Sequence, residues 1–161
     1  MKRTLVLMAL MVAGMAATAG RAWAQDSSID SDIAVLRADL RADKTKIMTD
    51  QMQMNDQDSA AFWPIYRQYQ SDLDKLSDQK VALIKEYADN YDKMTDQEVQ
   101  SLAERSFSLQ KKRVDLRQQY FKKISKAVSP KTAARFVQVE ERIDMLVNLQ
   151  LAANIPMVNN K

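Results

Sequence analysis

Cysteine and histidine are absent from the 161-residue sequence, and its only two glycines are Gly14 and Gly20. Without cysteine no disulfide can form, so the stability of the fold must come from packing. Without histidine or cysteine, the usual pairs of nucleophile and base and the typical zinc and iron sites are excluded. Without glycine after residue 20, no glycine-rich loop can hold a phosphate. We therefore expect no enzyme activity, no catalytic residue, no cofactor and no bound metal.

The first 24 residues have the three parts of a secretory signal peptide. Lys2 and Arg3 form a charged start, residues 4–19 an apolar core, and residues 22–24 a small-x-small cleavage site. A transmembrane anchor is the alternative, but it would need about 20 apolar residues and a charged stop. We therefore expect cleavage before Gln25 and a periplasmic chain with no membrane span.

Cleavage changes the charge balance of the chain. The net charge of the full sequence is +3, but residues 1–24 hold three of its 24 basic residues and none of its 21 acidic ones. The remaining chain is therefore neutral, and a nucleic-acid partner loses its main support in the composition. Paired carboxylates such as Glu140 and Glu141 are expected on solvated faces, because general acid–base chemistry needs a dry pocket that a narrow helical hairpin lacks.

Apolar residues recur at helical spacing through most of the chain and predict an all-α fold with four helices in one domain, residues 25–153. The first helix is expected from about Ser31 to Gln53, the third ends near Val128, and the fourth stops before Pro156. Residues 154–161 are expected to form a loose tail. The apolar positions that the fourth helix is expected to bury are Phe136, Val139, Ile143 and Leu146.

Three cap residues mark where helices begin. Asn55 precedes an acidic turn and caps the second helix, Thr95 opens a capping box with the glutamate three residues later, and Ser129 precedes a proline at the first position of the fourth helix. The second helix carries a heptad seam with one lysine in it, made of Phe62, Tyr66, Tyr69, Leu73, Leu76, Lys80, Leu83, Tyr87 and Tyr91.

The second and third helices, of about 36 and 32 residues, would reach roughly 50 Å at ~1.5 Å per residue. We therefore expect an elongated antiparallel hairpin of these two helices, with the shorter end helices folded onto it. The third helix has two neighbouring apolar stripes, which a thin layer of helices cannot both bury. Either a second subunit covers the remainder, as in a homodimer, or an apolar surface stays exposed. The stripes are Leu102, Leu109, Leu116, Tyr120 and Ala103, Phe107, Val114, Phe121, Ile124.

Pro64 lies inside the second helix, where proline removes a backbone hydrogen bond and frees the carbonyl of Ala60. A bend above ~20° is the usual result, and it would turn a straight hairpin into a curved cradle. Trp63 points off the heptad seam. It either lines an edge of this cradle or covers the first or fourth helix.

Two further patterns leave alternatives open. Met48, Met52 and Met54 have the spacing of a soft Cu(I) site, but methionine also fills irregular helix interfaces. Residues 99–126 hold eight basic residues against two acidic ones. These cations either pair with acidic neighbouring helices or form a surface that attracts acidic, partly unfolded chains.

Two short segments, MNDQD at 54–58 and VSPKT at 128–132, each place an apolar residue before a cap side chain. With the signal peptide, the four helices and the AARFVQVEERID segment at 133–144, this layout resembles the Spy/CpxP-like periplasmic proteins, which carry a repeated Leu-Thr-x-x-Gln motif. The resemblance implies an ATP-independent chaperone or an envelope-stress accessory protein, built as a cradle-shaped homodimer that holds unfolded clients. Metal-responsive relatives use histidines that this chain lacks.

The leading hypothesis is therefore a periplasmic holdase that binds unfolded or envelope proteins. The alternative is a non-catalytic structural or regulatory protein with one dedicated envelope partner. A holdase should suppress the aggregation of unrelated proteins, whereas a dedicated subunit should not. The residues expected to contact clients are Trp63, Tyr66, Tyr69, Phe107, Lys111, Arg113, Val114, Arg117 and Phe121.

Overall fold

The computed structural model describes residues 42–158. The predicted signal peptide, the predicted first helix before residue 42 and the last three residues of the tail lie outside the described residues. The chain divides into two compact units, Met1–Asp43 and Lys44–Lys161. We describe the second unit, which contains nearly all of the described residues.

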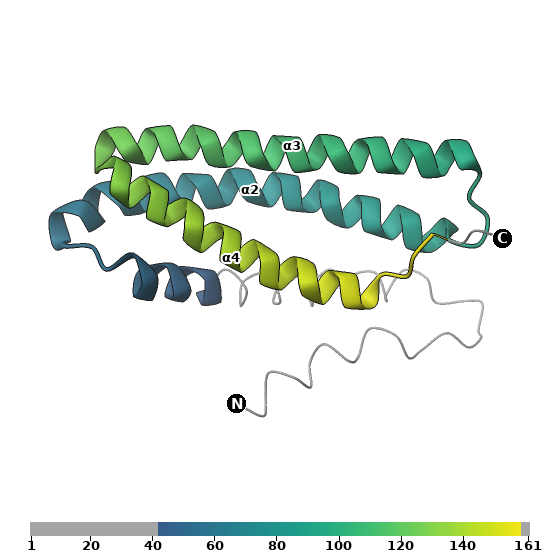
Figure 1. The fold of residues 1–161 in the computed structure, drawn as a ribbon, viewed down its shortest axis with the longest axis horizontal. Helices are drawn as coiled ribbons and strands as arrows, with labels where there is room; N and C mark the ends of the chain where they lie inside the picture. The colour runs from purple at the N-terminus through teal and green to yellow at the C-terminus, as the bar shows by residue number, and fades with distance from the viewer. Residues whose placement is uncertain (1–41, 159–161) are drawn as a thin grey trace, which may run out of the picture. The chain divides into compact units, whose positions relative to one another are not determined.

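Helices account for most of residues 42–158, and this part of the chain contains no strand, which confirms the all-α prediction. Residues 42–52 are helical and precede three longer helices, α2 (Asp56–Asn90), α3 (Asp96–Ala127) and α4 (Pro130–Asn154). Figure 1 shows α2 and α3 as the expected antiparallel hairpin. Helix α3 packs against both α2 and α4.

All three predicted caps are present. The Asn55 side chain accepts a hydrogen bond from the Asp58 N–H at 2.8 Å, and the Ser129 hydroxyl accepts one from the Thr132 N–H at 3.0 Å. At Thr95 the capping box is complete, because the Glu98 carboxylate accepts the Thr95 N–H at 2.7 Å. These side chains satisfy backbone donors that the first turn of each helix leaves unpaired.

The turn before α2 shows what the lack of glycine costs. Gln53, which follows the helical residues 42–52, has a φ of 49° and is therefore in the left-handed region. Glycine usually takes this position after a helix because it has no Cβ to clash. A chain with no glycine after residue 20 must put a larger residue there.

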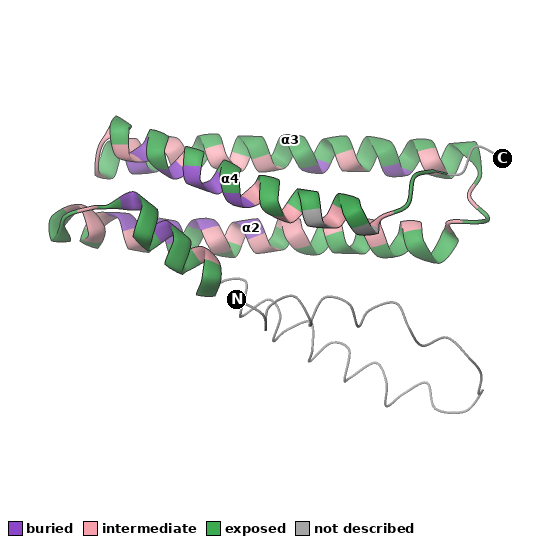
Figure 2. Cartoon of the chain, turned by 60° about the horizontal axis from the view of Figure 1, so that its bottom comes forward, coloured by how far each residue is buried: buried purple, intermediate pink, exposed green. Residues whose placement is uncertain are grey.

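The core lies at one end of the hairpin, as Figure 2 shows. We call this end the packed half (residues 44–52, 56–73, 118–127 and 130–143) and the remainder the open half (residues 74–90, 96–117 and 144–158). Ring pairs dominate the core: Tyr69 lies edge-on to Phe136 and to Tyr120, with centroids 5.0 and 5.3 Å apart, and such pairs add roughly 0.5–1.5 kcal/mol beyond their buried area. The buried residues of this cluster are Met48, Met52, Phe62, Tyr66, Tyr69, Leu73, Tyr120, Ile124, Ala133, Phe136, Val139 and Ile143.

Several sequence predictions are decided by this core. Met48 and Met52 are buried in it and Met54 packs against it, which favours packing over a Cu(I) site. The expectation for Leu146 is wrong, because its side chain is exposed. The reason is that the inward side of α4 continues from Ile143 to the half-buried Val147 and Leu151, which leaves Leu146 on the outer side.

Pro64 sits within α2, which continues as one helix through it. Both Pro64 and Ala60 are exposed, so water can solvate the Ala60 carbonyl that proline leaves without its helical partner. The outward position explains why a helix breaker is tolerated beside the core. The bend and the cradle shape remain predictions.

We expect Pro64→Ala to stabilise the protein by about 1–3 kcal/mol, because alanine restores a helical hydrogen bond while the exposed site loses no packing. Urea denaturation followed by circular dichroism would measure it. Gln68→Pro, one turn later on the same exposed surface, is the matched control and should destabilise by roughly 3 kcal/mol. A Pro64→Ala variant no more stable than the parent would contradict this account.

Candidate functional site

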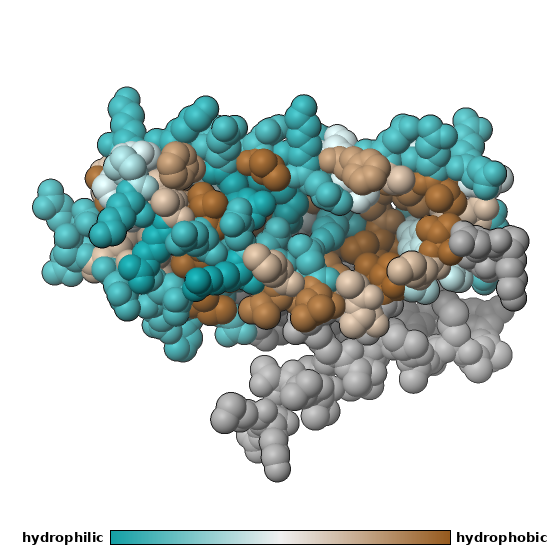
Figure 3. Space-filling model, viewed as in Figure 1, coloured by the Kyte–Doolittle hydropathy of each residue, from teal (hydrophilic) through white to brown (hydrophobic). Residues whose placement is uncertain are grey.

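A groove of about 680 Å³ lies between α2, α3 and α4 in the open half. Its walls are mainly apolar: α2 contributes Leu83 and Ile84, α3 contributes Leu102 and Leu109, and α4 contributes Leu151. Figure 3 shows hydrophobic side chains gathered around a hollow on this part of the molecule. A cavity of this size is typical of sites for small molecules.

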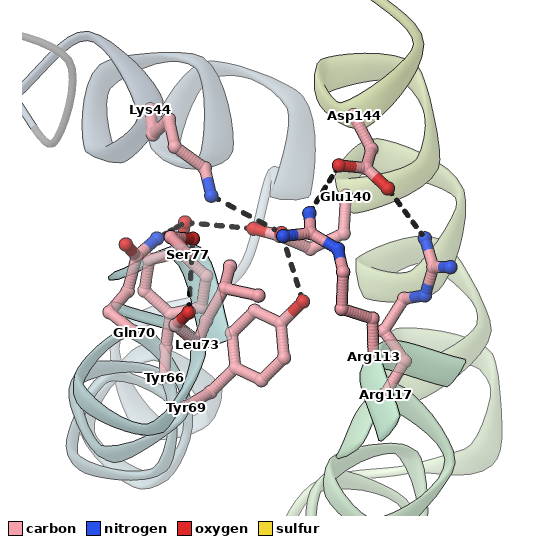
Figure 4. Close-up of polar contacts among 10 residues, drawn as sticks. All are labelled: Lys44, Tyr66, Tyr69, Gln70, Leu73, Ser77, Arg113, Arg117, Glu140 and Asp144. Carbon is pink, nitrogen blue, oxygen red and sulfur yellow. Dashed lines mark hydrogen bonds and ion pairs between the residues drawn. The ribbon is translucent and has the colours of Figure 1, made fainter. Parts of the chain in front are cut away.

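The inner end of the groove is cationic. Its lining residues include three cations and one carboxylate, Asp144. Arg113 donates to Asp144, and Arg117 lies 3.8 Å from the other carboxylate oxygen; Figure 4 shows both guanidinium groups facing Asp144 from α3. Lys80, from α2, donates instead to the amide oxygen of Asn148 at 2.7 Å. Burial lowers the pKa of Lys80, and the nearby Arg113 lowers it further.

Both ends of the groove are bounded. At the outer end, the Tyr87 hydroxyl donates to the Pro156 carbonyl at 2.9 Å, and the Tyr91 hydroxyl donates to the Met157 carbonyl at 2.8 Å. Val158 then lines the groove. The two tyrosines of the heptad seam thus hold the backbone at Pro156 and Met157, within the segment expected to form a loose tail. The inner end abuts the packed half.

A buried carboxylate joins the elements of the packed half next to the groove (Figure 4). Glu140 is 3% exposed and accepts hydrogen bonds from the hydroxyls of Tyr66 and Tyr69, each at 3.1 Å. The Lys44 ammonium reaches the same carboxylate at 3.5 Å. Burial, followed by the charge of Glu140, raises the pKa of both tyrosines, which therefore remain donors.

The structure corrects the predicted client surface at Tyr66 and Tyr69. Their side chains are 1% and 2% exposed and form part of the core, so they are out of reach of a client. Trp63 and Phe121 are half-buried and pack against this core. Trp63 lies edge-on to Phe62 with ring centroids 5.3 Å apart, which agrees better with a covering role than with the edge of a cradle.

The remaining predicted residues lie in the open half. Phe107, Lys111 and Val114 are exposed, whereas Arg113 and Arg117 are half-buried at the groove. Sequence reasoning missed Asp144 and the functional position of Lys80. The signal in the sequence was the position of Lys80 in an otherwise apolar heptad seam, which places a cation on the inward side of α2.

The basic residues of α3 divide into two groups. Its three arginines pair with neighbouring helices: Arg105 donates to Glu86 of α2 at 2.8 Å, while Arg113 and Arg117 face Asp144 of α4. Lys123 lies 4.2 Å from the ring centroid of Tyr120. Within residues 42–158, the exposed lysines Lys111, Lys112, Lys122 and Lys126 make no ion pair. Pairing with neighbouring helices therefore holds for the arginines, and the attraction of acidic, partly unfolded chains by the lysines stays a prediction.

Other kinds of site find no support in the described part of the chain. Residues 42–158 contain no group of three or more acidic side chains placed to hold a metal ion. None of the helices described is both long and apolar enough to cross a membrane. Comparisons with protein-family models, with curated proteins and with solved structures gave no match.

We expect Glu140→Gln to destabilise the protein by about 2–4 kcal/mol, because two buried hydroxyls lose a charged acceptor and Lys44 loses its counter-charge. Urea denaturation at neutral pH would measure the loss. Glu141→Gln is the matched control, since Glu141 is the next residue and is exposed. Equal stability of the two variants would argue against a structural role for the buried carboxylate.

Asp72 makes the stability of the α2–α3 pair depend on pH. Its carboxylate pairs with Lys75 at 2.8 Å and accepts the Tyr120 hydroxyl at 2.7 Å, and these bonds, that of Lys75 first, lower its pKa to about 2. A carboxyl whose pKa is lowered by folding stabilises the protein above its unfolded pKa of about 4, and this contribution is lost as the pH falls toward 2.

Asp72→Asn should therefore be less stable than the parent at neutral pH, and the difference should narrow as the pH falls from about 4 toward 2. Urea denaturation at a series of pH values would measure the free energy of unfolding of the parent and of the variant, and so the difference between them at each pH. Asp89→Asn is the control, because Asp89 is exposed on the same helix. A constant difference across the acid range would contradict the assignment.

Proposed function

We propose that the protein is a periplasmic, ATP-independent chaperone of the holdase type, or an envelope-stress accessory protein that binds other proteins without catalysis. The observation that carries the proposal is the exposure of large apolar side chains in the open half. Phe107 on α3 is 67% exposed and Leu149 on α4 is 69% exposed. Val114, Met145 and Leu146 are also exposed there.

Exposed apolar side chains in such number favour association. Each Å² of apolar surface removed from water contributes about 25 cal/mol, and large exposed apolar patches commonly mark protein-interaction sites. The unpaired lysines of α3 add an attraction for acidic segments. Unfolded chains offer both apolar and acidic side chains, so this surface suits them without requiring a defined shape.

Export and family resemblance support the same proposal. Residues 1–24 have the pattern of a signal peptide, and the cap segments at 54–58 and 128–132 resemble those of Spy/CpxP-like proteins. The caps themselves are formed by Asn55 and Ser129. A homodimer in the manner of that family would use the open half either as the subunit interface or as the rim of a client surface.

The test is light scattering from two unrelated aggregating proteins, with and without the purified protein, while the emission of Trp63 is followed. We expect suppression of both aggregations by the parent. The double variant Phe107→Ser/Leu149→Ser should suppress them several-fold less, because two exposed contact side chains are removed. Ile47→Ser is the matched control, since Ile47 is an exposed apolar residue of the packed half.

Suppression of neither protein would reject the holdase and favour one dedicated envelope partner. Equal suppression by the parent and the double variant would show that clients bind elsewhere. Because Trp63 covers the core, its emission should change little on client binding, in contrast to the expectation for a tryptophan within the client surface.

A further inference from the structure

We propose that the groove of the open half binds a long-chain carboxylate, a free fatty acid, with its carboxylate at Lys80 and Arg113 and its hydrocarbon chain along the apolar walls. Phe107 and Leu149, on which the proposed chaperone function rests, do not line this groove, whereas Val114 does. The proposed site depends on the interior of the groove, its charge and its closed ends.

The charge of the groove favours an anion. The lining residues place Lys80, Arg113 and Arg117 against the single carboxylate of Asp144, which leaves an excess of positive charge beside an apolar cavity. An ammonium has three donors and a guanidinium five, but Lys80 makes one side-chain hydrogen bond, to Asn148, and Arg113 makes one, to Asp144. Donors are therefore left over for an incoming carboxylate.

Burial makes that interaction stronger than it would be on the surface. The pKa of Lys80 is lowered mainly by burial and further by Arg113, which means that the charged form of the lysine is destabilised in the groove. A carboxylate arriving beside the ammonium would offset this destabilisation, because opposite charges interact more strongly where water is partly excluded. Charge-assisted hydrogen bonds are about twice as strong as neutral ones.

The walls fit a hydrocarbon chain. Leu83 and Ile84 of α2, Leu102 and Leu109 of α3, and Leu151 and Ile155 at the end of α4 face the same cavity. The volume of about 680 Å³ lies within the range for small-molecule ligands. The other polar residues that line the groove, Tyr87, Ser106, Gln110 and Asn148, are uncharged.

The closed ends favour a short linear ligand over a polypeptide that passes through. The tail is fixed by Tyr87 and Tyr91 at the outer end, and the Glu140 cluster belongs to the packed half beyond the inner end. A linear ligand that lies along the groove therefore meets the cations at its inner end. A fatty acid has its only charge at its end, whereas a through-running peptide would place neutral backbone amides there.

The experiment is calorimetric titration of the purified protein with laurate, below the concentration at which laurate forms micelles. Dodecanol and dodecyltrimethylammonium are the neutral and cationic probes of equal chain length. We expect saturable binding of laurate at one site, with at least about tenfold weaker binding of dodecanol and no binding of the cation, because only laurate satisfies the free donors.

Variants locate the site. Lys80→Met keeps the apolar stem and removes the charge, so it should weaken laurate about tenfold and leave dodecanol unchanged. Lys85→Met is the matched control, because Lys85 is exposed on the same helix. Ser106→Trp places a large side chain in the groove and should abolish binding of both. Thermal unfolding of each variant confirms that it is folded.

A second readout uses laurate labelled with ¹³C at the carboxyl carbon. Its NMR signal in the complex should show that the bound carboxyl stays ionised to lower pH than free laurate, and Lys80→Met should reduce this difference. The proposal is overturned if laurate does not bind, if dodecanol binds as well as laurate, or if Lys80→Met or Ser106→Trp binds laurate like the parent. The outcome is independent of the aggregation assay, so either proposal can fail alone.

Discussion

The buried carboxylate of Glu140 is the interaction on which the arrangement of the helices depends. Its partners come from two other elements: Lys44 from residues 42–52, and Tyr66 and Tyr69 from α2. A carboxylate buried to this extent is costly unless it is paired and hydrogen-bonded. Here the carboxylate has these partners in place. If α4 slid against α2, the Glu140 carboxylate and the two tyrosine hydroxyls would be left buried without hydrogen-bond partners. Apolar contacts alone would tolerate such sliding more easily, which is why a single polar cluster can set the register of an otherwise apolar core.

The position of this cluster determines where the structure is open. The large aromatic residues of the core lie around Glu140, in the first half of α2 and of α4 and the last half of α3. Beyond Ile143, the apolar side chains of α4 and α2 that line the groove, such as Leu151 and Leu83, are only half-buried. The helices therefore leave a groove and exposed side chains where a core of even thickness would have closed them. Packing is concentrated in one half, and the other half keeps large apolar side chains exposed.

The sequence predicted the helices, their caps and the facing side of α2 well, because these depend on local patterns. The residues of the heptad seam from Phe62 to Leu73 are buried and those from Leu76 to Tyr91 are half-buried. Depth could not be predicted in the same way, since spacing identifies the face of a helix and says nothing about what lies opposite. Tyr66 and Tyr69 were therefore expected at a client surface, although a carboxylate on another helix holds them in the core. The same limit applies to α3, whose second stripe is exposed at Phe107 and Val114 but half-buried at Phe121.

Lys80 lies where the packed half meets the open half. It occupies a seam position that would otherwise be apolar, at the boundary where the core ends and the groove begins. An apolar residue there would extend the core. Lys80 instead donates a hydrogen bond to Asn148 and lies near Arg113, so two positive charges are close together. Neighbouring cations in a half-buried site are unfavourable for folding unless an anion joins them. In a chain without histidine or cysteine, charge and apolar surface are the main means of recognition available. Their coincidence at one end of one groove is therefore the feature of the open half on which the proposed ligand site rests.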